Sequence, residues 1–322
     1  MNRKNGIDFF RLIGALAVMC IHASYGNLSY EYVSNLRLFS RWAVPFFFIT
    51  SGFFLGPKIE CNSLDFKRIQ KNVSQLISII LVSSIIYLPI CFKTKNMPKN
   101  IADLLVGIQP HLWFVGSLLT GYIAIWYLYF IKKNKILPYI SIFILLIALL
   151  IDSYDQFFHK NIGFFSVRFV LSIPFMYIGI IASKKNIYQV SNKLLIGMIL
   201  IGFAIQYFEA ELFLKLFSYP KIKHQFLIGT IITSIPLFIF TSKINLPENR
   251  FSEWGRKYSL FIYLYHPAIY FLMSQNLNKL IPLYSDYVMM FSPIIGFIIL
   301  IALAIFLEKY LPKLSNILNG NL

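Results

Sequence analysis

Three ionisable side chains lie within one apolar stretch of the sequence, residues 6–24: Asp8, Arg11 and His22. An ionised side chain in the hydrocarbon of a bilayer costs at least ~2.5–3.5 kcal/mol, so such residues usually serve a function. Arg11 and His22 are eleven residues apart, which is three helical turns, so both lie on one helix face about 16 Å apart. An imidazole titrates near neutral pH and accepts a proton from a hydroxyl group. The stretch therefore predicts a membrane helix with a fixed cation towards one end and a candidate general base near the other.

Each of these residues also has a purely structural interpretation. Asp8 precedes Arg11 by three residues, a spacing at which the two side chains form an ion pair on a helix. A histidine at a helix end often bonds a backbone carbonyl, which is the alternative to a catalytic role for His22. Both alternatives stay open from the residues alone.

Five further residues in the apolar segments are candidates for the same site. Basic and aromatic side chains gather at membrane interfaces. Arg41 precedes Trp42, and His111 lies two residues before Trp113, so both also fit an anchoring role. His266, which precedes Pro267, is either a packed polar group or the second histidine of a site. The five residues are Arg41, His111, Trp113, Arg168 and His266.

The composition excludes a soluble domain. Hydrophobic residues make up 57% of the 322 residues and charged residues only 13%, against about 25% in soluble proteins. The net charge of +17 comes from lysines and arginines in short loops between apolar runs, which is typical of membrane topology and argues against nucleic acid as a partner. Cys20, Cys61 and Cys91 are scattered and have neither disulfide nor metal-site spacing.

Apolar runs of membrane-spanning length predict an all-α, polytopic membrane protein of about ten transmembrane helices in one domain, residues 1–322. If the N-terminus is cytoplasmic, about 18 lysines and arginines lie in inner loops and about 9 in outer ones, which favours both termini inside. The first run resembles a signal peptide but is long and charged, so we expect it to be retained. The expected spans are 7–25, 38–56, 73–92, 112–131, 137–152, 163–183, 194–209, 225–242, 258–275 and 285–307.

This topology gives each polar residue a depth. It places Arg11 in the inner half of the membrane, and His22, Arg41, His111 and Arg168 in the outer half. We expect these four to share one outward-opening cavity with His266 at its floor, as a hypothesis about which helices are neighbours. On the inner side, Lys67, Arg68 and Lys71 form a basic cluster, which either anchors to anionic lipid or clamps the phosphates of a cytosolic cofactor.

Four stretches of the sequence together resemble acyltransferase family 3, membrane-bound enzymes that acylate cell-envelope sugars and related acceptors. They are Ile7-Asp-x-x-Arg11 followed by His22, Val44-Pro-Phe-Phe-Phe-Ile-Thr-Ser-Gly52, His111-Leu-Trp-Phe114 and Ser259-Leu-Phe-Ile-Tyr-Leu-Tyr-His266. The chain is also similar to the membrane half of vancomycin-resistance-type serine racemases, notably at Asn5–Arg11. Those proteins carry a soluble racemase domain after the last span, so racemase activity is not expected of these 322 residues.

The resemblance implies a reaction and a set of site residues. His22 matches the family's essential histidine and Arg11 its basic residue, while Arg68 and Lys71 fall at an R-x-x-R motif whose second arginine is a lysine here, which loses bidentate phosphate binding. The implied donor is acyl-CoA, with acetyl-CoA as the default, no metal is implied, and the implied acceptor is an envelope sugar or a lipid-linked molecule. The residues expected to meet substrate are Asp8, Arg41, His111, Trp113, Arg168 and His266.

Two other classes of protein are alternatives to the acyltransferase. A membrane carrier for a small polar solute such as serine needs the same polar cavity, although the absence of repeated halves in the sequence argues against it. A structural or sensory membrane protein leaves Arg11 and His22 without an explanation.

Overall fold

Helices make up the regular structure of the part of the chain that the computed structural model describes. It describes residues 4–23, 25, 28–59, 63–94, 108–158, 167–184, 189–280 and 285–321, without the side chains of 276–280 and 285–287. The predicted all-α, polytopic architecture is confirmed. The helices are α1 Asn5–His22, α2 Tyr30–Phe39, α3 Ala43–Leu55, α4 Lys67–Thr94, α6 Trp113–Phe130, α7 Leu137–Ile151, α8 Ser172–Lys184, α9 Asn192–Phe217, α10 Ile228–Lys243, α11 Arg250–Leu280, α12 Ser285–Met290, α13 Ser292–Tyr310 and α14 Pro312–Leu318.

Among the described residues, 7 helical segments are long and apolar enough to cross a membrane, and α8 and α10 are shorter apolar helices. The seven include α1, α4, α9 and α13 whole. The predicted span 258–275 falls inside α11, whose 31 residues begin at Arg250. The first turns of this helix are charged, so hydropathy alone does not include them in the span. The seven segments are Asn5–His22, Tyr30–Lys58, Lys67–Thr94, Pro110–Phe130, Asn134–Ile151, Asn192–Phe217 and Ser292–Tyr310.

Two predicted spans differ from the structure at their beginnings. The second is divided by a turn at residues 40–42 that joins α2 to α3, so Arg41 lies in a turn. Pro45 then stands in the first turn of α3, where a missing N–H costs no hydrogen bond, so it does not kink the helix. The sixth span becomes α8, which begins at Ser172. Arg168 therefore lies in the turn before this helix and not within it.

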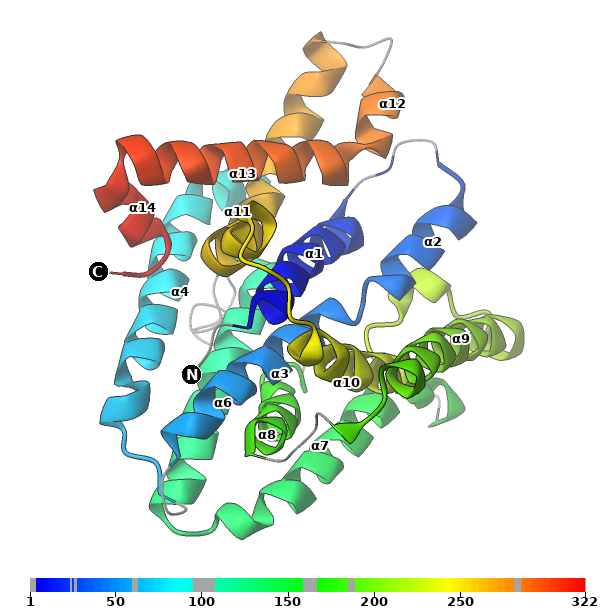
Figure 1. Ribbon diagram of the computed structural model, residues 1–322. Coiled ribbons are helices and arrows are strands. Elements are labelled where there is room, and N and C mark those ends of the chain that lie inside the picture. The colour runs from blue at the N-terminus through cyan, green and yellow to red at the C-terminus, as the bar shows by residue number, and fades with distance from the viewer. Residues whose placement is uncertain are drawn as a thin grey trace.

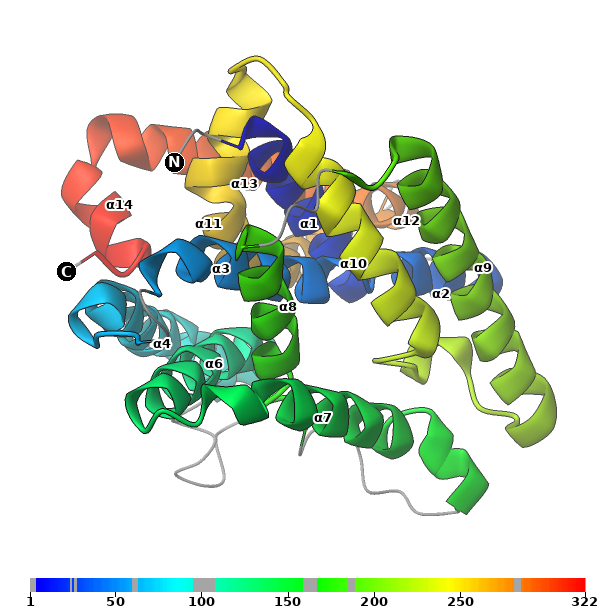
Figure 2. The ribbon, with the colours of Figure 1, turned by 60° about the horizontal axis from the view of Figure 1, so that its bottom comes forward.

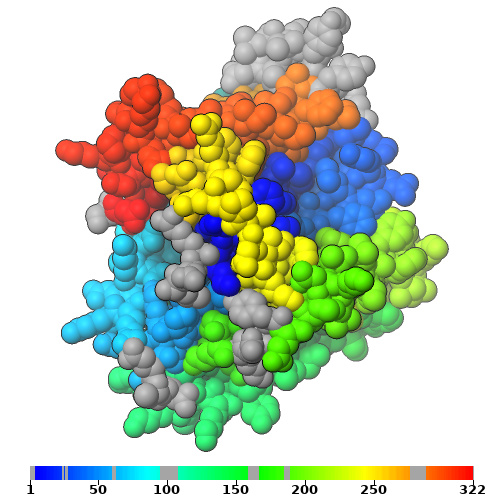
Figure 3. All heavy atoms as spheres, viewed as in Figure 1, coloured from blue at the N-terminus to red at the C-terminus, as the bar shows by residue number. Residues whose placement is uncertain are grey.

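Helix α1 occupies the centre of the molecule. It contacts α2, α3, α10, α11 and α13, and it lies among them in Figure 1. In Figure 2, α8 stands between α3 and α7, and α9 runs beside α10. In the space-filling view, dark blue atoms of the N-terminal segment show between the yellow atoms of the α10–α11 region and the light blue and cyan atoms of the following helices (Figure 3). The residues that carry the candidate chemistry are therefore held from several sides.

Glycines allow the closest helix contacts. A Cβ atom at Gly52 of α3 would lie 2.0 Å from the Met176 carbonyl oxygen, and one at Gly179 of α8 would lie 2.1 Å from that of Ile49. A Cβ atom at Gly255 of α11 would lie 1.8 Å from the carbonyl oxygen of Asp8. Backbones approach this closely only where the side chain is a hydrogen atom. Gly52 and Gly179 therefore fix α3 against α8, and Gly255 fixes α11 against α1 beside Asp8.

Candidate active site

Three histidines from three distant parts of the chain form one cluster. His22 ends α1, His111 lies in the short 3-10 turn Pro110–Leu112, and His266 lies in the middle of α11. The ring centroids of His22 and His266 are 5.3 Å apart, and those of His111 and His266 are 5.5 Å apart. His266 and His111 are buried, with 0% and 5% exposure, whereas His22 is exposed. The structure thus brings together the three histidines of the hypothesised cavity.

Proline 267 explains why the cluster forms here. In an α-helix the N–H of residue 267 would bond the carbonyl of Tyr263, but proline has no N–H. His266 takes over this carbonyl, with its Nδ1 2.7 Å from the Tyr263 oxygen. The next carbonyl, that of Leu264, accepts hydrogen bonds from the Tyr87 hydroxyl at 2.7 Å and from His111 Nε2 at 3.0 Å. The break in the α11 backbone therefore provides the acceptors that hold two of the three histidines.

A small cavity of about 210 Å³ adjoins the cluster at His22. Its wall includes Tyr270, whose hydroxyl donates to the Met19 carbonyl at 3.0 Å and so ties α11 to α1. Ser274 and Ser292 contribute polar atoms, while the remaining walls are apolar. His22 is therefore the member of the cluster that a molecule in this cavity would meet.

At the opposite end of α1, an ion-pair network surrounds Asp8. Arg11 Nη1 lies 3.3 Å from Asp8 Oδ1, as the sequence predicts, and Arg256 Nη1 lies 3.8 Å from Asp8 Oδ2. Arg256 also pairs with Glu248 at 3.6 Å. The side chain of Asp8 is only 8% exposed, so its charge is compensated by two arginines rather than by water. Asp8 holds both guanidinium groups at this end of α1.

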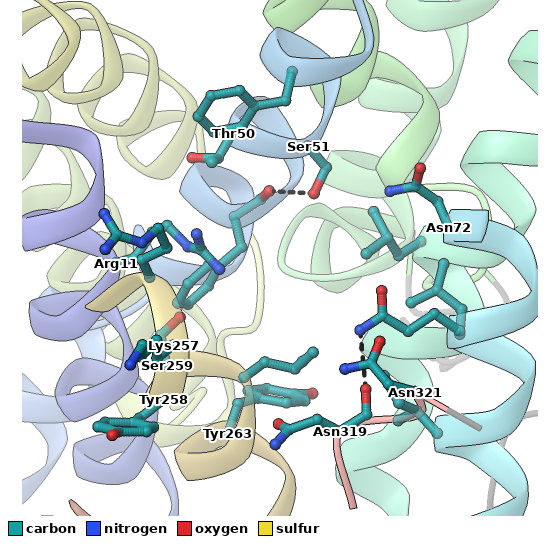
Figure 4. Close-up of a pocket in the computed structure, with 18 of the residues that line it drawn as sticks. Arg11, Thr50, Ser51, Asn72, Lys257, Tyr258, Ser259, Tyr263, Asn319 and Asn321 are labelled. Carbon is teal, nitrogen blue, oxygen red and sulfur yellow. Dashed lines mark hydrogen bonds between the residues drawn. The ribbon is translucent and has the colours of Figure 1, made fainter. Parts of the chain in front are cut away.

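These arginines line the larger cavity, of about 470 Å³, together with Lys257. Figure 4 shows Arg11 and Lys257 on one side of it, and Asn72 of α4 on the other. The residues after α14 close a further wall, because the Gln75 side chain donates to the Asn319 carbonyl at 2.9 Å. Cations and side-chain amides together suit a ligand with phosphates and amide groups. The polar side chains in the wall, apart from these, include Thr50, Ser51, Ser259, Asn316 and Asn321.

Tyr263 connects the larger cavity to the histidine cluster. Its side chain lines the cavity, and its hydroxyl donates to the backbone carbonyl of His111. Its ring centroid lies 6.1 Å from that of His111 and 6.0 Å from that of His266. One residue of α11 therefore touches both the cation-lined cavity and the histidines.

The remaining predicted site residues lie around these two features. Arg41 donates to the Gln225 side chain at 3.0 Å and the Ile222 carbonyl at 3.5 Å, and the Arg168 guanidinium lies 5.5 Å from the centroid of the Trp113 ring. Asp152 interacts electrostatically with both arginines. This group is adjacent to the histidines through Trp113, which follows the turn that holds His111.

The basic cluster on α4 does not line the larger cavity but lies close to its wall. Arg68 Nη1 donates to the Lys58 carbonyl at 3.0 Å, and Lys58 Nζ donates to Asn72 Oδ1 at 2.8 Å. Lys71 interacts electrostatically with Lys58. Asn72 is part of the cavity wall, so Lys58 contacts the wall directly and Arg68 is connected to it through Lys58.

Sequence reasoning missed several residues of the larger cavity. Arg256 and Lys257 read as loop cations, because the charged start of α11 lies outside the predicted span. Asn316 and Asn319 follow the last predicted span and carried no recognisable motif. The usable signal for the two cations was their position, one to two turns before Tyr263 on one helix.

Comparisons with known proteins show which proteins the chain is similar to. A family described as an acyltransferase domain matches residues 4–308. The chain is 26% identical over 328 residues to a serine/alanine racemase of Enterococcus gallinarum, a match that covers 92% of this chain and 46% of the relative. It is also 35% identical over 139 residues to an amino-acid racemase of Enterococcus faecalis, which covers 40% of this chain and 19% of that relative. The chain spans less than half the length of these curated relatives. No solved structure matches.

The fold and the two cavities define a polytopic membrane protein with a histidine cluster at one end of a central helix and a cation-lined cavity at the other. Because the family match extends over nearly the whole chain, this protein belongs to the acyltransferase 3 family. The resemblance in the sequence motifs is thereby confirmed.

Proposed function

We propose that this protein transfers an acyl group, by default acetyl, from acyl-CoA to a hydroxyl group of a cell-envelope carbohydrate or related acceptor. The observation that carries the proposal is the connection through Tyr263 between a cavity lined by cations and amides and a cluster of three histidines. The family membership supports acyl transfer as the reaction class.

The larger cavity is the proposed donor site. Arg11, Arg256 and Lys257 would bind the phosphates of acyl-CoA, since guanidinium and ammonium groups form charge-assisted hydrogen bonds with phosphate. The amides in the wall would pair with the amide groups of its long arm. With both termini in the cytoplasm, this cavity faces the cytosol, where acyl-CoA is made. Arg68 and Lys71 would meet the distal phosphates outside the cavity wall.

His22 is the proposed general base. The imidazole takes the proton of the acceptor hydroxyl while its oxygen forms a bond to the acyl carbon, the carbon–sulfur bond breaks, and the proton passes to the departing CoA thiolate. Formation of a transient acyl-imidazole on His22, from which the acceptor then takes the acyl group, is the other route open to this residue. The acceptor would enter beside His22 and be bound from the side of Arg41, Trp113 and Arg168.

A carrier for a small amino acid such as serine is the second candidate. The names of the relatives, which are racemases of serine, alanine or other amino acids, favour it. Two cavities at opposite ends of α1 would also suit a transport path.

Acetyl-CoA binding and turnover by the purified protein in lipid nanodiscs separate the two candidates. The acyltransferase predicts that labelled acetyl-CoA binds, that its thioester is turned over, and that Arg11→Ala weakens binding while His22→Ala abolishes turnover. A wild-type protein that does not bind acetyl-CoA but transports labelled serine in proteoliposomes would overturn the acyltransferase assignment and support the carrier.

The cavity also predicts which cations matter most for the donor. Arg256→Gln removes a guanidinium from the wall and should weaken acetyl-CoA binding about tenfold, the size expected for one charge-assisted hydrogen bond. Arg68→Gln should weaken it less, since Arg68 lies outside the wall and bonds a backbone carbonyl. The measurement is the dissociation constant of labelled acetyl-CoA in nanodiscs. A larger effect at Arg68 would locate the phosphates at the basic cluster of α4 instead.

A further inference from the structure

The hydrogen bond from His266 to the Tyr263 carbonyl fixes the protonation of its ring. A carbonyl oxygen can only accept, so Nδ1 of His266, 2.7 Å away, must carry the proton. The other nitrogen, Nε2, is then an acceptor with a free lone pair. It is buried and has no hydrogen-bond partner among the described residues. Leaving such a group unsatisfied in a membrane core is costly, so a donor is expected during function.

The nearest candidate donor is His22. The two ring centroids are 5.3 Å apart, with an angle of 37° between the ring planes. Two imidazoles joined by a linear N–H···N bond have centroids separated by roughly 5.3 Å, given a donor–acceptor distance near ~3 Å. The observed separation of the two rings is therefore the one that such a bond requires. His111 does not compete with this function, because its Nε2 already donates to the Leu264 carbonyl.

We infer that His266 is a positioning residue for His22: its Nε2 accepts a hydrogen bond from one ring nitrogen of His22, directly or through one water molecule. This bond selects the His22 tautomer whose other nitrogen carries a lone pair and faces the small cavity. When His22 takes the proton of the acceptor hydroxyl, it becomes an imidazolium with two N–H groups. His266 stabilises that cation through the bond, and no proton needs to leave the pair.

The sequence around the kink gives this arrangement a simple origin. Pro267 frees the Tyr263 carbonyl, the carbonyl fixes the proton of His266 on Nδ1, and the fixed proton turns Nε2 into an acceptor on a ring 5.3 Å from that of His22 at the end of α1. Tyr270, one turn further along α11, bonds the Met19 carbonyl and holds α1 at the same level. The inference rests on the proposed function only in assigning the base to His22.

Two substitutions at position 266 separate positioning from a merely structural role. His266→Asn places an amide N–H near the position of Nδ1, so it preserves the bond to the Tyr263 carbonyl and removes the acceptor for His22. His266→Gln places an amide oxygen near the position of Nε2, so it preserves the acceptor and gives up the carbonyl bond. The assay measures kcat and KM for acetyl-CoA turnover in nanodiscs, together with the dissociation constant of acetyl-CoA.

Positioning predicts a loss of kcat between about 10-fold and 1,000-fold for His266→Asn, a much smaller loss for His266→Gln, and unchanged donor binding for both. The opposite order, with His266→Asn active and His266→Gln inactive, would overturn the inference and leave His266 as a structural partner of the kink. Equal activity of both variants and wild type would overturn it as well. Failure of the proposed function is a different result, because the wild type itself would then show no turnover.

Discussion

Two histidine sites in this molecule contain similar residue types but differ in what they can do. In one, which we call the open site, His22, His111 and His266 form a cluster that meets a cavity at His22. In the other, which we call the closed site, Ser153 Oγ lies 2.6 Å from His224 Nδ1 and 3.0 Å from Asp152 Oδ2. A serine, a histidine and an aspartate also form the triad of many hydrolases, so by composition alone the second site is the more suggestive one.

The geometry of the second site argues against nucleophilic catalysis. In a hydrolytic triad the histidine lies between the serine and the aspartate, whereas here the serine lies between the other two. An ionised carboxylate only accepts, so the single hydroxyl proton of Ser153 goes to Asp152, and the hydroxyl oxygen accepts from His224. The histidine therefore donates to the serine and does not activate it.

The carboxylate of the closed site already accepts hydrogen bonds from the backbone. Asp152 Oδ2 accepts from the backbone N–H groups of Gln225 at 2.8 Å and Phe226 at 2.6 Å. Ser153 and His224 are 0% and 1% exposed. This network fixes the segment before α10 against the end of α7. His224 and His266 each keep a buried Nε2 without a partner among the described residues, so access to a cavity, more than residue type or a free nitrogen, distinguishes the first site.

The largest predicted effect tests the open site, the cluster of His22, His111 and His266. His22→Ala should lower acetyl-CoA turnover by about 10³-fold, the middle of the range for loss of a general base. Because His22 is exposed, the melting temperature in detergent should stay close to that of the wild type. Ser274→Ala, in the same cavity, is the matched control and should keep most of the turnover. Retention of turnover by His22→Ala would remove His22 from the chemistry.

The closed site should show the reverse pattern. Ser153→Ala removes the hydroxyl that His224 and Asp152 share, and it should lower the free energy of unfolding by about 1–3 kcal/mol. Turnover per folded molecule should remain within about twofold, because the residue is away from both cavities' walls. The measurements are thermal unfolding and kcat on the same preparation. A variant with normal stability and no turnover would make Ser153 part of the active site and would reverse the comparison.

The sequence predicts the helices well but not their neighbours. Apolar runs of membrane length located α1, α4 and α9, because each must cross the bilayer by itself. The spacing of Arg11 and His22 gave one helix face and two depths. That His266 faces His22 depends on how α11 packs on α1, which requires Gly255 against Asp8 and the pair of Asp8 with Arg256. These are contacts between residues almost 250 positions apart, and a single sequence does not encode them as a local pattern.

One feature of the site, the bond from His266 to the Tyr263 carbonyl, could in principle be predicted from the sequence. A proline within a helix frees the carbonyl four residues earlier, so Pro267 points to Tyr263, and a histidine beside the proline is well placed to bond it. The walls of the larger cavity were not readable, because Asn72, Gln75 and Asn319 come from a helix flank and a chain end and meet only in the folded protein. The candidate general base was thus identified from sequence, whereas most of the proposed donor site was not.

The smallest predicted effect concerns the pH dependence of the closed site, whose groups lie in the connections outside the spans. Burial lowers the pKa of His224 to about 4, and Arg41 adds to the shift. Burial raises the pKa of Asp152 to about 6, against hydrogen bonds that favour its ionised form. As the pH falls from about 6.5 to 4, the unfolded chain gains a proton on His224 that the folded protein does not, which lowers the free energy of unfolding. From pH 6 to 4 the folded protein gains a proton on Asp152 that the unfolded chain does not, which raises it.

The two effects oppose each other, so replacing one group should reveal the other. In Asp152→Asn the stabilising protonation is gone, and the free energy of unfolding should fall more steeply than in the wild type between pH 6 and pH 4, by up to ~1.4 kcal/mol per pH unit. Unfolding in detergent at several pH values measures the two slopes. The double variant Asp152→Asn with His224→Gln is the control and should lose the extra slope. Parallel curves for the wild type and Asp152→Asn would mean that Asp152 stays ionised over this range in the folded protein, because its hydrogen bonds and Arg41 outweigh the effect of burial.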